Sequence, residues 1–96
     1  MIVHIVMFQF KEKDKSENTL KAKAMLEALV PKIDPLLSME VGIDFSGSER
    51  AMDLSLISTF ETKEGLAEYA VHPAHLEVVA FIKEVTTQSR VVDYEK

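Results

Sequence analysis

Apolar and polar residues follow one another along this chain in patterns that predict four strands. Residues 2–10 are apolar at nearly every position, which is typical of a short strand buried on both faces. Residues 39–45 alternate apolar and polar side chains, which predicts a half-buried strand. The polar stretch 46–50 predicts a hairpin that returns as the strand 54–60. Residues 88–95 are expected to form the last strand, with three buried side chains, Val91, Val92 and Tyr94.

Helical periodicity occupies two further regions. In the first, Asp14 and Glu17 have the spacing of a capping box, and a helix is expected to run from there to about Ile33. Its apolar stripe follows the i, i+3, i+4, i+7 pattern: Ala22, Met25, Leu26, Leu29, Val30 and Ile33. In the second region, Thr62 is expected to cap a short helix.

A proline divides the second helical region into two helices. The residue before a proline is disfavoured in the α conformation, whereas proline itself suits the first turn of a helix. One helix is therefore expected to end near His72 and another to start at Pro73. The later helix presents one apolar side, made by Ala74, Val78, Phe81, Ile82 and Val85.

The predicted order of elements is β-α-β-β-α-β, which is the split βαβ arrangement of the α+β, ferredoxin-like fold. In that fold the helices cover one face of a four-stranded antiparallel sheet. The other face has no cover within residues 1–96, although the first strand is apolar on both sides. A large uncovered apolar face is an interaction surface. We therefore expect one domain, residues 1–96, that forms a homodimer by packing sheet to sheet about a two-fold axis.

Composition and charge narrow the functional classes. A net charge of −5 without a basic block argues against nucleic acid and anionic membrane surfaces as partners. The chain has no cysteine, which excludes disulfides, thiol catalysis and cysteine metal sites. The sequence opens without a charged leader, and no apolar run approaches the ~20 residues of a membrane span, so a cytoplasmic location is expected. There is no glycine-rich phosphate loop, and no cofactor is expected.

The candidate chemistry lies around the proline, where Tyr69, His72 and His75 are close in sequence. His75 is expected in the first turn of a helix, where the positive end of the helix dipole favours a neutral imidazole. A neutral imidazole can act as a general base, and a nearby tyrosine can donate a hydrogen bond to a developing enolate oxygen. His75 and Tyr69 are therefore the catalytic candidates. His4, on an otherwise apolar strand face, and His72 are the candidates for contacting a substrate.

Each of these residues also has a structural interpretation. His75 could hydrogen-bond the helix start or a strand, and Tyr69 could pack in the core with its hydroxyl bonded. His4 could have a structural partner, since a lone polar group on an apolar face usually does. His72 could cap the second helix. The two later histidines also form an H-x-x-H pair, but a metal site would need a third ligand and a proline interrupts the helix between them, so no metal is expected.

Three segments of the chain resemble the stress-responsive A/B barrel (Dabb) domain family. They are residues 3–10 (VHIVMFQF), 68–75 (EYAVHPAH) and 91–94 (VVDY). The resemblance covers essentially the whole chain, and its most specific part is His-Pro-x-His with a tyrosine three residues before it. It implies a dimeric α/β barrel, in which two four-stranded sheets form one eight-stranded barrel. That agrees with the dimer expected from the apolar pattern.

One branch of this family, the plant olivetolic acid cyclase type, is enzymatic and closes a linear polyketide by aldol condensation without a cofactor. The resemblance implies that the working residues of that branch correspond to His75 and Tyr69. It also implies that a histidine at the position of His4 lines the pocket. All three residues are present in this chain. The positions that select a long alkyl polyketide lie outside the motif, so the resemblance names no substrate.

Three functions are compatible with these observations. The first is a domain that binds a small organic molecule in a pocket between helices and sheet, with no defined reaction. The second is a cofactor-independent, polyketide-cyclase-like lyase or isomerase, with His75 as general base and Tyr69 as oxyanion donor. The third, by analogy of fold alone, is a cofactor-free monooxygenase or a haem-degrading enzyme of the dimeric barrel type.

Overall fold

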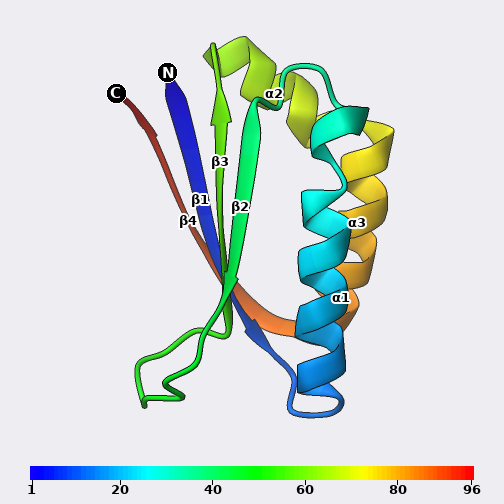
Figure 1. The fold of residues 1–96 in the computed structure, drawn as a ribbon, viewed down its shortest axis with the longest axis vertical. Coiled ribbons are helices and arrows are strands. Elements are labelled where there is room, and N and C mark those ends of the chain that lie inside the picture. The colour runs from blue at the N-terminus through cyan, green and yellow to red at the C-terminus, as the bar shows by residue number, and fades with distance from the viewer.

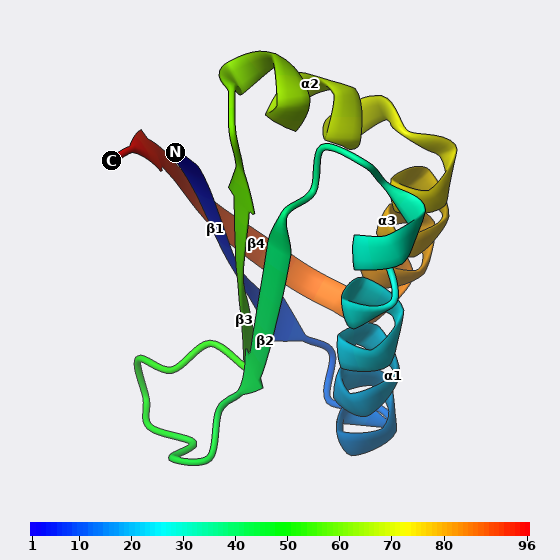
Figure 2. The ribbon, with the colours of Figure 1, turned by 45° about the horizontal axis from the view of Figure 1, so that its top comes forward.

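A computed structural model describes residues 1–96 (Figure 1). Its elements in chain order are β1 (Ile2–Phe10), α1 (Lys15–Glu27), the 3₁₀ helix η1 (Val30–Lys32), β2 (Ser38–Ile43), β3 (Leu54–Phe60), α2 (Lys63–Val71), α3 (Pro73–Val85) and β4 (Thr86–Glu95). The strands form one antiparallel sheet in the order β2-β3-β1-β4. The helices lie on one side of it in both views (Figure 1 and Figure 2). The predicted α+β, ferredoxin-like fold is confirmed. None of the helices has the length and apolar character needed to cross a membrane.

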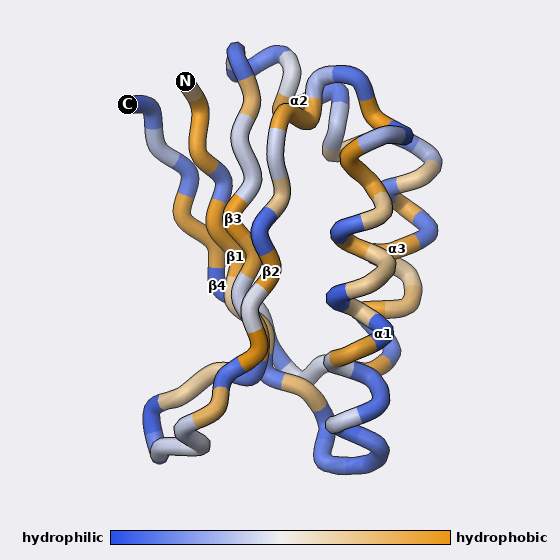
Figure 3. Tube along the Cα trace, in the orientation of Figure 1, coloured by the Kyte–Doolittle hydropathy of each residue, from blue (hydrophilic) through white to orange (hydrophobic).

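The core fills the space between the helices and the side of the sheet that faces them. Figure 3 shows apolar positions along the strands and along the helices that run beside them. Every second residue of β3 is buried on this side: Leu54, Leu56, Ser58 and Phe60. The stripe predicted for the first helix packs against them, with Ala22, Leu26, Leu29 and Ile33 buried. Apolar residues that recur every second residue in a strand, and about every 3.6 residues in a helix, lie on one side of each element. These two sides therefore form the core, as predicted.

The opposite side of the sheet has no helix over it (Figure 1). Strand pairing places Ile5 of β1 beside Ile57 of β3 and Val92 of β4 on this side. Met7 and Tyr94 lie on the same side, and both are exposed, as are Ile57 and Val92. We call these five residues the outer patch. It is the uncovered apolar face that the pattern of the first strand predicted.

The prediction that the apolar residues of β4 are buried is wrong for the single chain. Val91, Val92 and Tyr94 are 58%, 56% and 45% exposed. The physical reason is that β4 is an edge strand, with β1 on one side and no strand on the other. Val92 and Tyr94 belong to the outer patch, so only a second molecule could cover them.

α1 ends earlier than predicted, and the chain continues as a 3₁₀ helix instead of an α-helix to residue 33. Pro31 lacks an N–H and restricts the residue before it, so the α-helical pattern cannot continue through this point. After α1 most of the backbone hydrogen bonds join residues three apart instead of four. For example, the N–H of Leu29 donates to the carbonyl of Leu26 at 3.1 Å.

The capping box predicted at Asp14 and Glu17 does not form. Asp14 has φ 56° and ψ 31°, in the left-handed region, and its side chain makes no capping hydrogen bond. A capping residue needs an extended backbone to aim its side-chain oxygen at the first N–H groups of the helix. Thr62 has that conformation, and its Oγ1 accepts from the N–H of Gly65 at 3.0 Å, as predicted.

β2 ends at Ile43, so the predicted strand is too long and Phe45 lies beyond the observed strand. The carboxylate of Asp44 accepts hydrogen bonds from the N–H of Gly47 (2.8 Å) and the hydroxyl of Ser46 (3.2 Å), which turns the chain. The bond from Gly47 also holds the pKa of Asp44 below its ordinary value. Phe45 is fully exposed as a result. The predicted hairpin between β2 and β3 is confirmed.

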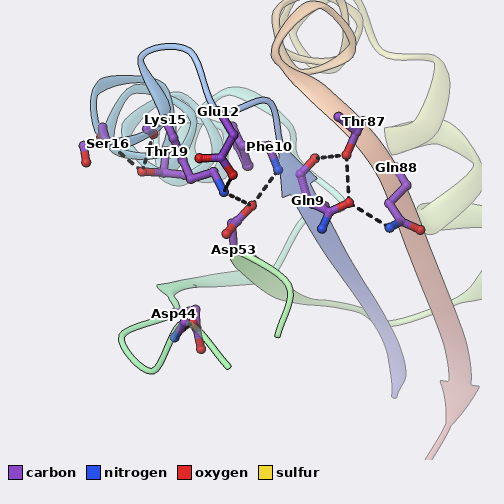
Figure 4. A network of polar contacts seen from close by, with 11 residues as sticks. Gln9, Phe10, Glu12, Lys15, Ser16, Thr19, Asp44, Asp53, Thr87 and Gln88 are labelled. Carbon is purple, nitrogen blue, oxygen red and sulfur yellow. Dashed lines mark hydrogen bonds and ion pairs between the residues drawn. The ribbon is translucent and has the colours of Figure 1, made fainter. Parts of the chain in front are cut away.

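One carboxylate fastens the β2–β3 loop to the end of β1 (Figure 4). Asp53 Oδ2 accepts from the N–H of Phe10 at 2.7 Å and lies 3.4 Å from Lys15 Nζ. The N–H of Asp53 donates to the carbonyl of Phe8 at 2.8 Å. Lys15 also pairs with Glu12 at 2.9 Å. These contacts satisfy backbone groups at the point where β1 leaves the sheet.

Candidate functional site

A cavity of about 180 Å³ lies between α3 and the helix-facing side of the sheet. Three of the four candidate side chains line it: His4 from β1, Tyr69 from α2 and His75 from α3. The ring centroids of Tyr69 and His75 are 4.2 Å apart, and those of His4 and Tyr69 are 6.4 Å apart. Most of the remaining wall is apolar. The fold therefore brings together, at one cavity, residues from both ends of the chain.

The break between α2 and α3 places Tyr69 beside His75. α2 ends at Val71, His72 has an extended backbone, and Pro73 is the first residue of α3. This confirms the predicted break. Because the two helices change direction at His72, the last turn of α2 and the first turn of α3 can contact each other through these two rings.

The hydrogen bonding of His75 suits a base. Its Nδ1 lies 3.0 Å from the carbonyl oxygen of Ala70. A carbonyl only accepts, so Nδ1 carries the proton and Nε2 keeps a free lone pair in the neutral ring. Burial lowers the pKa of His75 below its usual 6.5, the nearby His4 and His72 add to this effect, and the bond to Ala70 opposes it. The direction agrees with the neutral imidazole expected from the helix dipole, although the main cause is burial.

Tyr69 retains its proton and presents a hydroxyl without a protein partner. Only 1% of the residue is exposed, and its ring also packs against Phe60 with 5.1 Å between centroids. Burial raises the pKa of Tyr69 to about 12, so the group is a hydrogen-bond donor at neutral pH. No fully enclosed polar side-chain atom in the chain lacks a partner. The unbonded hydroxyl therefore reaches the cavity, where an oxygen of a ligand could accept from it.

His4 is oriented by Asp93, a site residue that the sequence analysis missed. β1 and β4 pair with these two residues directly opposite each other, and His4 Nδ1 is hydrogen-bonded to Asp93 Oδ1. Because a carboxylate accepts, Nδ1 is the donor, and Nε2 is left without a protein partner. Asp93 lies in the family-like segment 91–94, but its pairing with His4 depends on the register between the first and last strands.

His72 does not line the cavity. Its Nδ1 accepts a hydrogen bond from the N–H of Ala74 at 3.0 Å, so the side chain caps α3. This is the structural alternative considered for His72, and the expected substrate contact has no geometric support. The H-x-x-H pair also gathers no third ligand, since no three histidine, aspartate or glutamate side chains of the chain come together in a set that could hold a metal ion.

The fold and the cavity define a small ferredoxin-like α+β domain with a partly open hollow between its helices and its sheet. The family model described as "Stress responsive A/B Barrel Domain" matches residues 2–96. The stress-response A/B barrel domain-containing protein HS1 of Arabidopsis thaliana is 32% identical over 99 residues, which cover 98% of this chain and 88% of HS1. The chain therefore belongs to the stress-responsive A/B barrel domain family, and the resemblance inferred from the sequence is confirmed.

Solved structures share this fold. A dimeric protein of unknown function and ferredoxin-like fold from Bacteroides fragilis has a TM-score of 0.91 and 28% sequence identity, covering 99% of this chain and 95% of that protein. An antibiotic biosynthesis monooxygenase has a TM-score of 0.80 at 13% identity, covering 100% of this chain and 98% of the other. At that identity the likeness shows a common fold and carries no reaction over to this chain.

Proposed function

We propose that this protein binds a small carbonyl compound in the cavity and catalyses proton transfer at the carbon beside the carbonyl group. The observation that supports the proposal is a free imidazole nitrogen on His75 next to an unpartnered hydroxyl on Tyr69, with both residues lining one cavity. Removal of such a proton requires a base, which would be His75, and a hydrogen-bond donor to the developing enolate oxygen, which would be Tyr69. The apolar walls would hold the rest of the ligand and exclude water.

In the proposed step, the Nε2 lone pair of His75 takes a proton from the carbon. The C–H electron pair becomes the C=C bond of an enolate, and the carbonyl π pair moves onto the oxygen. That oxygen accepts a hydrogen bond from the hydroxyl of Tyr69. The imidazolium then exchanges its proton with solvent, and transfer of a solvent-derived proton back to carbon completes the exchange of the hydrogen. If the enolate carbon instead attacks a second carbonyl of the same molecule, a C–C bond forms and the imidazolium proton passes to the new alkoxide.

The state of both groups supports these roles. A lowered pKa keeps His75 in its free-base form at neutral pH. A pKa of about 12 keeps Tyr69 protonated and able to donate. A positioned general base contributes about 10²–10⁴ to a rate, and one oxyanion donor about 10²–10³. His4, fixed by Asp93, adds a third polar contact at the same end of the cavity.

The test is the exchange of the hydrogens beside the carbonyl of 2-octanone for deuterium in D₂O, followed by proton NMR. We expect the protein to accelerate the exchange. His75→Asn should abolish the acceleration, because an asparagine amide can still donate to Ala70 but has no basic nitrogen. The matched control is His72→Asn, which keeps a good helix cap outside the cavity and should exchange as the unchanged protein does.

The outcomes separate binding from catalysis. If 2-octanone binds the protein, as observed by saturation-transfer NMR, and the exchange is not accelerated, the cavity is a binding site and the catalytic step is wrong. If acceleration survives in His75→Asn, another group is the base. If 2-octanone does not bind, both parts of the proposal are wrong.

We also infer that two copies of the chain associate through the outer patch. The patch is apolar and exposed in the single chain, and a large apolar surface of this kind is typical of an interface. The similar protein from Bacteroides fragilis is described as dimeric. The cavity lies on the other side of the sheet, so pairing of the outer patches would leave it accessible.

A further inference from the structure

The part of the cavity far from His75 is lined by three polar side chains, Lys83, Thr86 and Ser89. Lys83 follows His75 by eight residues on α3, which places it about 12 Å further along the helix axis at 1.5 Å per residue. On the sheet side, Ser89 of β4 pairs with Phe8 of β1, while His4 pairs with Asp93 four residues further along β4. Tyr69 and His75 therefore lie toward one end of the cavity, and Lys83 lies toward the other.

Lys83 gives this cavity a charge opposite to that of the chain. The chain has 16 acidic and 11 basic residues, yet none of the 13 residues that line the cavity is an aspartate or a glutamate. Lys83 forms no hydrogen bond or ion pair within the protein, whereas Lys15 and Lys23 each pair with a glutamate. Lys83 is exposed and lines the cavity, so its unpaired ammonium is available to bind an anion there.

The hydroxyl groups beside Lys83 restrict the kind of anion. The Thr86 hydroxyl donates to the carbonyl of Ile82 at 2.8 Å, so it has no hydrogen left for a ligand. The Ser89 hydroxyl has no partner in the protein and can donate. One ammonium and one hydroxyl donor match a carboxylate, which carries a single charge and accepts at two oxygens. A phosphate dianion would leave one negative charge without a partner.

We propose that the ligand of this cavity is an elongated monocarboxylate. Its carboxylate would contact Lys83 and Ser89, its middle would lie against the apolar wall, and a carbonyl group at its other end would lie at Tyr69 and His75. The inference rests on the proposed function for the position of the carbonyl end. The separation of about 12 Å along α3 selects a medium-length chain.

The test uses 7-oxooctanoate, which has a ketone near one end and a carboxylate at the other, and its uncharged methyl ester. Calorimetric titration should show that the acid binds about tenfold more tightly than the ester, which corresponds to about 1.4 kcal/mol. In Lys83→Met, which keeps an unbranched side chain only one atom shorter and removes its charge, the two ligands should bind equally. The matched control is Lys63→Met, an exposed lysine at the start of α2 outside the cavity, which should preserve the tenfold difference.

This design is a double-mutant cycle between the ammonium and the carboxylate, so a general effect on folding cancels. Added salt should reduce the preference for the acid and leave the binding of the ester unchanged. If acid and ester bind equally to the unchanged protein and both are weakened by Tyr69→Phe, the carboxylate inference is wrong while the proposed function stands. If neither ligand binds, the inference and the proposed function fail together.

Discussion

The substitution Tyr69→Phe separates the proposed chemistry from the fold, because it removes one oxygen and keeps the ring. The ring accounts for the packing: the residue is 1% exposed, and its centroid lies 4.2 Å from that of His75 and 5.1 Å from that of Phe60. The hydroxyl makes no hydrogen bond within the protein, so its removal breaks none. We expect the free energy of unfolding to change by less than about 0.5 kcal/mol, below the ~0.5–1.5 kcal/mol that a bonded hydroxyl contributes.

The same substitution removes the donor to the enolate oxygen. Loss of one oxyanion donor costs about 2.7–4 kcal/mol of transition-state stabilisation, so the exchange of 2-octanone hydrogens should slow by about 10²–10³. Urea unfolding with linear extrapolation measures stability, and NMR measures exchange. Ser58→Ala is the stability control, because the Ser58 hydroxyl is fully buried and donates to the His4 carbonyl at 3.3 Å. That control should lose about 0.5–1.5 kcal/mol.

The opposite pattern would refute this reasoning. A Tyr69→Phe protein that is less stable by more than about 1 kcal/mol and still exchanges at the full rate would show that the hydroxyl is a structural group. The site would then hold a packed tyrosine, as in the structural interpretation of this residue, and His75 would have no oxygen partner.

Two further predictions concern pH and assembly. Because burial lowers the pKa of His75, the folded chain binds fewer protons than the unfolded chain below pH ~6.5. The contribution of His75 to the free energy of unfolding is therefore fully present above pH ~6.5 and is lost as the pH falls through the lower pKa of the folded chain. Urea unfolding at a series of pH values across this range should show the decline. The His75→Asn protein should lack the share of the decline that comes from His75. Met7→Glu puts a charge into the outer patch, so the protein should sediment as a monomer instead of a dimer in sedimentation velocity. The control is Leu20→Glu on α1, where the leucine is 62% exposed, and this variant should remain dimeric. A dimeric Met7→Glu protein, or a monomer before any substitution, would place the interface elsewhere or remove it.

The features predicted correctly from the sequence are those set by local rules. The apolar run of β1, the alternation of β3 and the break before Pro73 each depend on neighbouring residues only, and the structure has all three. The errors at the ends of elements fall where a single residue changes a local rule, whereas the error about burial on β4 comes from its place at the edge of the sheet. Pro31 shortens α1, the left-handed backbone of Asp14 prevents the capping box, and the turn at Asp44 ends the strand early.

The site was predicted in part, because it combines local and distant contacts. Tyr69 and His75 are six residues apart across one helix break, so their proximity could be read from the sequence. The bond between His4 and Asp93 depends on the register of two strands at opposite ends of the chain. The place of Lys83 at the far end of the cavity depends on how α3 packs against the sheet, which no local pattern reveals.

The break at Pro73 has a consequence for how such a domain could change over time. Proline fixes its own φ near −65°, so the angle between α2 and α3, and with it the spacing of Tyr69 and His75, is set largely by the covalent chain. The walls of the hollow come from later residues of α3 and from β1, α1, β3 and β4. Substitutions there could admit molecules of a new size or polarity without disturbing the arrangement of the Tyr69 and His75 rings. The helix break at Pro73 would thus allow related proteins to keep the proposed chemistry while they bind different compounds.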